Sequence, residues 1–139
     1  MILLPIHPEF VDKIRTGGKK FEFRTRVPTG IDDDPLVLVY ATLPVGAIVG
    51  YFRTVRVLSL PPSVLWERTK GAAGITRKRF RGYFKGRMTA YALEIGEWRE
   101  FVNPCSVADL RGGSVVPQSF TFLSPEQRRR IMRRATKRV

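Results

Sequence analysis

The chain has 139 residues, 43% of them hydrophobic and 11% aromatic, which is sufficient for one globular domain with its own core. Its single cysteine, Cys105, excludes an intramolecular disulfide, and no stretch approaches the roughly 20 apolar residues that a membrane-spanning helix requires. The formal net charge is +13. These features predict a basic, cytoplasmic protein with no membrane partner, and the first residues lack the regions of a signal peptide.

The first 26 residues predict a strand, a helix and a second strand. Residues 2–6 form a short apolar run, and a helix begins at His7-Pro8 because proline suits the first helical position. The pair Gly17-Gly18 ends this helix, since only glycine takes a positive φ without a Cβ clash. A strand then runs to about residue 26.

Two longer strands follow a loop over residues 28–35. They are predicted over residues 36–42 and 47–58, and a proline turn joins them. Gly50 marks a bend or a bulge within the second of these strands.

Residues 61–86 predict two helices. The first opens at Pro61-Pro62 and ends near residues 71–74, and the second begins at Thr76, a favourable N-cap, and ends at Gly86. The second helix has two distinct stripes. One is a buried stripe of Phe80, Tyr83 and Phe84, and the other is a cationic stripe of Arg77, Arg81 and Lys85.

The remainder predicts strands over residues 88–96 and 98–102 that pair across a tight turn, a helix over 107–110 and a strand over 120–123. Ser124 and Gln127 form a capping box that starts an arginine-rich helix, whose apolar stripe is too narrow for firm docking. About six short strands with inserted helices predict an α+β fold built on a small, strongly bent β-barrel.

Residues 17–24 carry the most informative pattern, G-x-K-x-x-E-x-R. By the period of a strand, Phe21 and Phe23 share one face, while Glu22 and Arg24 share the other with further charges. Acid and base side by side are typical of a polar cleft, although a solvated, self-paired strand face has the same pattern. Lys19 has the parity of the phenylalanines, so it joins the cleft only if the strand has not yet begun there.

Positive charge is concentrated in two segments. Residues 65–87 contain eight basic residues and one acid, residues 124–139 contain seven and one, and the remainder is neutral. This distribution favours a polyanionic partner, nucleic acid in particular, over a role in solubility alone. The candidate contacts to a phosphate backbone are Arg77, Arg81, Lys85, Arg129, Arg130, Arg133 and Arg134.

The chain resembles the ASCH domain family of the PUA-like superfamily. The resemblance rests on the motif at residues 17–24, on Tyr40-Ala41-Thr42 before a proline turn, on residues 47–50 and on Pro117-Gln118-Ser119-Phe120. These run in the family's order from residue 1 to about residue 123. We therefore expect an ASCH-type, PUA-like domain over residues 1–123 and a basic C-terminal helix over residues 124–139.

The resemblance implies a β-barrel with helices around it, and a charged cleft similar to RNA-binding clefts. We expect this cleft to bind RNA or a nucleotide, with RNA favoured over DNA and a modified nucleoside as a further ligand. The alternative is a hydrolase that acts on a modified nucleoside or on RNA, because other family members are ribonucleases. The candidate ligand-binding residues are Lys19, Glu22, Arg24, Tyr40, Thr42, Gln118 and Ser119.

One branch of the family resembles amidohydrolases for acetylated cytidine, which use a Lys, a Thr three residues later and a Glu in the helical region. Here Lys19 matches, but Glu22 stands at the Thr position and Gly71-Ala72-Ala73-Gly74 at the Glu region. If the chain is an enzyme, its candidate catalytic residues are therefore Lys19, Glu22, Thr42 and Ser119.

No cofactor and no metal are expected. One histidine and one cysteine cannot form the usual zinc set, and the aspartates at 32–34 lack the spacing of a calcium loop. His7 precedes a proline, so it predicts a helix start more than a catalytic base.

Overall fold

The computed structural model describes residues 1–111 and 119–136, and it has the predicted α+β composition. The strands are β1 (Ile2–Ile6), β2 (Phe21–Arg24), β3 (Leu36–Ala41), β4 (Ala47–Leu60), β5 (Ala90–Cys105) and β6 (Thr121–Phe122). The helices are α1 (Pro8–Arg15), α2 (Pro62–Thr69), α3 (Arg77–Tyr83), α4 (Val107–Arg111) and α5 (Pro125–Thr136), with a short 3-10 helix, η1 (Lys70–Ala72), after α2. In the part of the chain that is described, no helix is both long and apolar enough to cross a membrane.

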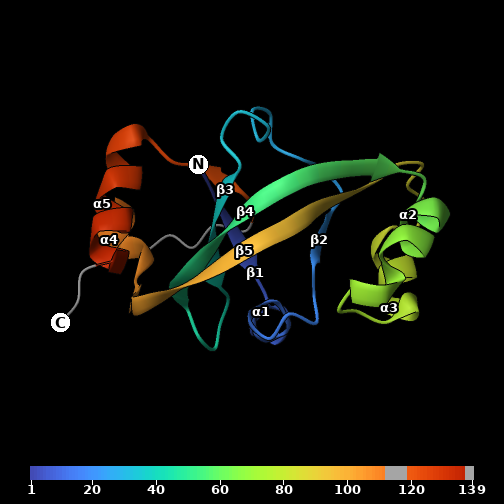
Figure 1. The fold of residues 1–139 in the computed structure, drawn as a ribbon, viewed down its shortest axis with the longest axis horizontal. Helices are drawn as coiled ribbons and strands as arrows, with labels where there is room; N and C mark the ends of the chain where they lie inside the picture. Colours follow the sequence, from blue (N-terminus) through green and yellow to red (C-terminus); the bar gives the residue numbers. More distant parts are fainter. Residues whose placement is uncertain (112–118, 137–139) are drawn as a thin grey trace.

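The six strands form one curled sheet in the order β2-β5-β4-β3-β1-β6. Only β1 and β3 are parallel neighbours; the other pairs are antiparallel. The long β4–β5 ribbon twists along the molecule, and the sheet curls into a half-barrel (Figure 1). The predicted small, strongly bent β-barrel of about six strands is confirmed in this form.

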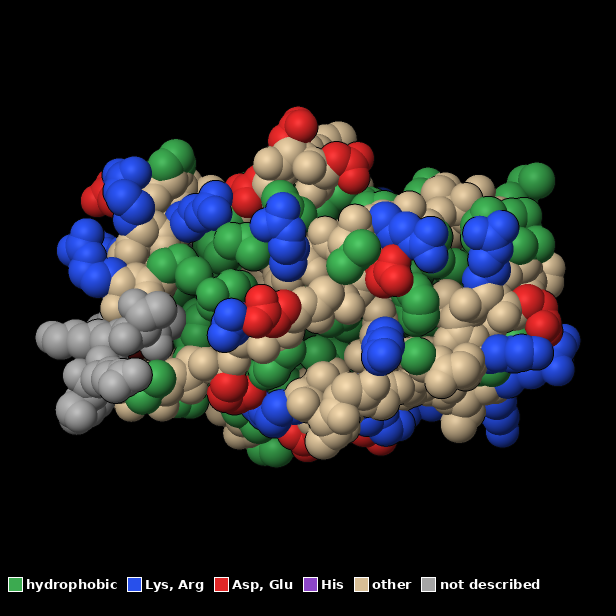
Figure 2. Space-filling model, viewed as in Figure 1, with side chains coloured by type: hydrophobic (Ala, Val, Ile, Leu, Met, Phe, Trp, Pro, Cys, Tyr) green, Lys and Arg blue, Asp and Glu red, His purple; other side chains and the backbone are tan. Residues whose placement is uncertain are grey.

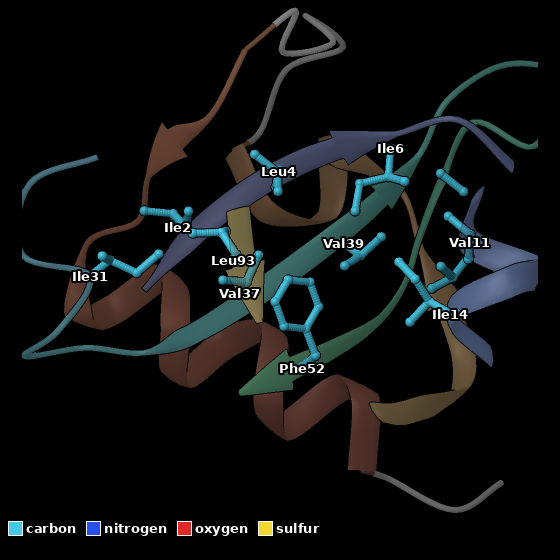
Figure 3. Close-up of a cluster of buried hydrophobic side chains, with 12 residues drawn as sticks. Ile2, Leu4, Ile6, Val11, Ile14, Ile31, Val37, Val39, Phe52 and Leu93 are labelled. Carbon is cyan, nitrogen blue, oxygen red and sulfur yellow. The ribbon is translucent and has the colours of Figure 1, made fainter. Parts of the chain in front are cut away.

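Alternate residues of β3 supply two separate cores, as the period of a strand requires. Val37 and Val39 pack with Phe52 and with Val11 and Ile14 of α1 (Figure 3). Leu38 and Tyr40 point to the opposite face, into a second cluster with residues of β5, α4 and α5. A third cluster fills the space between β2, the far end of the β4–β5 ribbon, α2 and α3. These clusters fix the helices on the sheet.

β5 is one strand of 16 residues, so the predicted tight turn between two shorter strands was wrong. Gly96 serves a close approach between strands instead, because a Cβ there would lie 2.8 Å from the carbonyl oxygen of Arg53. Gly50 has the same role, since a Cβ would lie 2.6 Å from the ring of Trp98. The register of β4 shifts beside Gly50, which confirms the predicted bulge.

Four of the helices lie at the two ends of an elongated molecule, α2 and α3 at one end and α4 and α5 at the other, and α1 lies between them (Figure 1). Lys and Arg side chains lie over both ends in the view of Figure 2, and others lie between them. The two cationic segments found in the sequence are therefore far apart on the molecule.

α5 docks on the sheet, so the expectation that its apolar stripe is too narrow was wrong. Ile131 is only 1% exposed and packs in the second core cluster. The capping box is present: the backbone nitrogen of Gln127 donates to the Ser124 hydroxyl at 3.1 Å, and the backbone nitrogen of Ser124 donates to Oε1 of Gln127 at 2.9 Å. Arg128 also pairs with Asp34 at 3.2 Å. One well-buried isoleucine, a cap and an ion pair together hold the helix.

Candidate nucleic-acid-binding site

A pocket of about 400 Å³ lies where α1, β2 and α3 meet. Because β2 is an edge strand, the pocket reaches side chains from both of its faces. The lining combines cations, one carboxylate and aromatic rings, namely Pro5, Ile6, His7, Phe10, Lys19, Glu22, Phe23, Arg24, Ile75, Arg79, Gly82 and Tyr83.

Lys19 lies in the pocket wall with only 2% of its surface exposed. It precedes β2, which begins at Phe21, and its backbone nitrogen donates to the carbonyl of Lys13 at 3.0 Å. Strand parity therefore does not apply to it. Its ammonium group donates to the carbonyl of Ala73 at 2.8 Å and lies 4.8 Å from the ring centre of Phe23 and 5.3 Å from that of Phe10.

Burial lowers the pKa of Lys19 to about 8, because removal of water disfavours the charged amine. The negative charge of Glu22 opposes this effect, and the positive charges of Lys13 and Arg24 add to it. The pocket thus contains an amine that titrates close to physiological pH.

Gly74 makes room for the stem of Lys19. Its φ is +68°, and a Cβ there would lie 2.5 Å from Cβ and 2.7 Å from Cγ of Lys19. Two carbonyls hold the segment that ends at Gly74. The carbonyl of Ala72 accepts from the backbone nitrogen of Lys20 at 2.8 Å, and the carbonyl of Gly74 accepts from the ammonium of Lys13 at 3.1 Å. The segment Gly71-Ala72-Ala73-Gly74 therefore forms the surface against which the side chain of Lys19 packs.

Glu22 and Arg24 also line the pocket. The Glu22 residue is 6% exposed, and its carboxylate lies 3.2 Å from Nη2 of Arg24. The same Nη2 donates to the carbonyl of Pro5 at 2.7 Å. Nε of Arg24 is buried and has no acceptor among the described residues, which leaves one donor of this guanidinium unsatisfied.

The rim of the pocket carries residues that the sequence reading did not assign to it. Tyr83 is 44% exposed, so its predicted place in the buried stripe was wrong; Phe80 and Phe84 alone are buried. Arg79 pairs with Glu9 at 2.7 Å and lies 4.8 Å from the ring centre of Phe10. The signal available in the sequence was that Arg79 and Tyr83 are four residues apart, on the helix side away from Arg77.

His7 also lies at the rim, and its Nδ1 accepts from the backbone nitrogen of Glu9 at 3.3 Å. It is the N-cap of α1, as the sequence predicted for a helix start.

The other predicted ligand-binding residues lie away from the lining. Tyr40 is buried in the second core cluster, on the opposite side of β3. Thr42 is half-buried, and its backbone nitrogen donates to the carbonyl of Ile6 at 3.0 Å, so it lies next to the pocket without lining it. Ser119 is exposed just before β6, and Gln118 lies outside the described residues.

The candidate phosphate-binding cations do not share one surface. Arg77 and Arg81 line a second groove of about 310 Å³ between α2 and α3, on the other side of α3 from Arg79, and Lys85 is exposed after that helix. Arg129, Arg130 and Arg133 are exposed on α5, and the side chain of Arg134 lies outside the described residues. In the described part of the chain, no group of three or more His, Cys, Asp or Glu side chains is arranged for a metal ion.

Comparisons with known proteins agree with this architecture. The model of the ASCH domain matches residues 4–110. The chain is 27% identical over 132 residues to an ASCH domain-containing ribonuclease of Zymomonas mobilis, which covers 94% of this chain and 88% of that protein. The crystal structure of ASCH from Zymomonas mobilis superposes with a TM-score of 0.84 at 26% identity, and covers 95% of this chain and 93% of that one.

A more distant likeness concerns the fold alone. The N-terminal domain of Staphylothermus marinus McrB superposes with a TM-score of 0.60 at 13% identity, over 96% of this chain and 93% of that one. The curled half-barrel with its helices is a PUA-like fold, and the family model spans most of its length. The chain belongs to the ASCH domain family.

Proposed function

We propose that the pocket between α1, β2 and α3 binds one nucleotide of a single strand of RNA. The observation that carries this proposal is the convergence of buried Lys19 and Glu22 with half-buried Arg24 beneath an exposed aromatic ring, Tyr83. A clamp of charges with a ring at its rim is the combination that unpaired bases require, because it offers hydrogen bonds to a base edge and a surface for stacking.

Each group has a defined task in this proposal. The carboxylate of Glu22 accepts from an exocyclic amine, as carboxylates do with cytosine. Tyr83 stacks on the base or on its neighbour, and Arg79 at the rim contacts a phosphate. A ligand oxygen that reaches the buried Nε of Arg24 satisfies this donor, which has no acceptor in the part of the chain that the structure describes.

A single strand suits the pocket better than a duplex. A base inside a duplex is stacked and paired, whereas a base in a loop or a free strand can enter a pocket at a lower cost. The net charge of +13 supports a polyanionic partner. The name of the Zymomonas mobilis relative, a ribonuclease, favours RNA over DNA as this partner.

Fluorescence anisotropy with labelled hexanucleotides of RNA and DNA, and with a short duplex, tests the proposal. We expect Tyr83→Ala to weaken binding of single-stranded RNA about 5- to 150-fold, which corresponds to about 1–3 kcal/mol for one stacked base. Tyr83→Phe is the control, because it keeps the ring. Glu22→Gln should change the order of preference among the four bases. Equal affinity of Tyr83→Ala and the wild type, or a preference for duplex, would refute the proposal.

RNA cleavage is the second candidate function, favoured by the relative's name and by the lysine in the pocket. In the simplest reaction, neutral Lys19 takes the proton of a 2′-hydroxyl, and the 2′-oxygen attacks the adjacent phosphorus. The bond to the 5′-oxygen breaks, and this oxygen takes a proton from water. The products are a 2′,3′-cyclic phosphate and a 5′-hydroxyl. Arg79 at the rim stabilises the negative charge on phosphorus oxygens.

Analysis of the product ends distinguishes cleavage from binding alone. We expect Lys19→Met to lose cleavage, whereas Lys20→Met, which removes the same charge from an exposed neighbour outside the pocket lining, should retain it. One 2′-deoxynucleotide at the cleaved position should block the reaction. Activity that survives in Lys19→Met would exclude Lys19 as the base.

A further inference from the structure

The groove between α2 and α3 has the composition of a nucleotide site. Its volume is about 310 Å³, and it is lined by rings and charges that include Trp66, Glu67, Arg77, Phe80 and Arg81. The ring centres of Trp66 and Phe80 are 5.1 Å apart, so the aromatic side chains support one another. Trp66 is half-buried, which leaves part of its surface open to the groove.

The groove is electropositive. Its carboxylate, Glu67, lies 2.8 Å from the ammonium of Lys70, and this hydrogen bond holds the pKa of Glu67 below its ordinary value. Arg77 and Arg81 are exposed, and neither forms an ion pair with any residue that the structure describes. The charge of Arg77 also lowers the pKa of Glu67, so this guanidinium lies near the carboxylate of the groove. Two exposed guanidinium groups beside a partly open indole fit a phosphate joined to a base.

Helix α3 separates this groove from the pocket of Lys19. Arg79, Gly82 and Tyr83 line the pocket, whereas Arg77 and Arg81 line the groove. The solvent-facing side of α3 between the pocket and the groove forms a ridge. Gly82 lies on this ridge; it is exposed, and its Cβ position has open space around it. Lys78 is exposed on the same ridge. A chain of nucleotides can cross α3 here without meeting a bulky side chain, and Lys78 is available to a phosphate.

We infer that the α2–α3 groove is a second nucleotide site, which holds a neighbour of the nucleotide in the Lys19 pocket. One strand of RNA then lies across α3 with Gly82 beneath its backbone. The identity of the strand as RNA rests on the proposed function, whereas the second site rests on the residues that line the groove. It explains the orientation of Arg77 and Arg81 away from the first pocket.

The test measures how affinity grows with the length of RNA. Fluorescence of Trp66 reports the groove directly once Trp98→Phe has removed the other tryptophan of the chain. Mononucleotides and single strands of two to six nucleotides are titrated at constant salt. We expect the affinity to rise with length, together with quenching of Trp66, and we expect Arg77→Ala/Arg81→Ala to lower the affinity for the longer strands about 10- to 100-fold.

Arg129→Ala/Arg130→Ala is the matched control, because it removes the same charge from exposed positions at the other end of the molecule. Lys78→Glu reverses the charge on the ridge at a residue that lines neither the pocket nor the groove, and it should reduce the gain with length without altering mononucleotide binding in the pocket. Equal losses in both arginine pairs, or no quenching of Trp66 by any strand, would overturn the inference.

Two other outcomes separate this inference from the proposed function. If Glu22→Gln and Tyr83→Ala change nothing while the Arg77/Arg81 variant loses binding, the pocket proposal fails and the groove remains a nucleotide site. If polyglutamate displaces the strand and quenches Trp66 as strongly as RNA of equal charge does, the groove binds an acidic protein, and the inference is refuted.

Discussion

Replacement of Gly74 by alanine tests whether the helical segment and the pocket lysine form one unit. The new Cβ would lie 2.5, 2.7 and 3.0 Å from Cβ, Cγ and Cδ of Lys19. These atoms belong to the stem of the side chain near the backbone, so they cannot move aside as the end of a flexible chain can. Either Lys19 or the segment that carries Gly74 must shift.

Two terms contribute to the expected cost. A non-glycine residue in the left-handed region costs about 1–2 kcal/mol, which applies because φ of Gly74 is +68°. The overlap with a packed side chain adds about 1–3 kcal/mol. We therefore expect Gly74→Ala to lower the free energy of unfolding by about 2–5 kcal/mol.

Two control variants separate these terms. Gly86 has a φ of +77° and open space around its Cβ position, so Gly86→Ala measures the backbone cost alone. Gly71 has open space and no positive φ, so Gly71→Ala should be close to neutral. Urea unfolding of the three variants gives the comparison. If Gly74→Ala costs no more than Gly86→Ala, the stem of Lys19 is not held against Gly74, and the reasoning fails.

Three further predictions concern the pocket and α5. Burial lowers the pKa of Lys19 from 10.5 to about 8, so the charged amine destabilises the folded state below pH 8, and this penalty disappears between about pH 8 and 10.5. The unfolding free energy of the wild type relative to that of Lys19→Met should therefore rise by about 3 kcal/mol over that pH range. A difference that does not change with pH in urea titrations would contradict this prediction. Ile131→Ala should cost about 2–5 kcal/mol and the exposed Arg130→Ala less than about 0.5, as measured by thermal unfolding, if α5 is docked through its buried isoleucine. Purified protein should release no acetate from acetylated cytidine, because Glu22 replaces the threonine of the amidohydrolase branch; turnover in a chromatographic assay would show that other groups replace the lost ones.

Local signals in the sequence were sufficient for most of the elements. Proline at the first position of α1, Thr76 as the N-cap of α3 and the capping box of Ser124 and Gln127 each depend on neighbours within one turn, and the structure has all three. The geometry of the motif followed from strand parity. It also followed from the glycine pair, which delays β2 until Phe21 and leaves Lys19 in the preceding turn.

The errors arose where residues distant in sequence decide the outcome. β5 continues past Gly96 because β4 lies beside it and approaches closely, which no pattern within 88–102 reveals. Tyr83 has the spacing of a buried residue, yet α3 is anchored by Phe80 and Phe84 against Phe23, which rotates Tyr83 toward the rim of the pocket. The surface that Ile131 packs against likewise comes from β5 and α4, so the narrow apolar stripe of α5 alone does not predict whether this helix docks.

Lys19 has an energetic cost that its packing does not offset. Its ammonium donates to one carbonyl, of Ala73, and lies over two rings, yet burial still lowers its pKa. A methionine would fill the same volume without that cost, so the charge does not serve stability. Beside it, Nε of Arg24 is a buried donor that has no acceptor within residues 1–111 and 119–136. A buried amine with a lowered pKa and a guanidinium with one unsatisfied donor in the same pocket are typical of a site that is completed by an anionic ligand, because a phosphate or a base oxygen relieves both penalties at once.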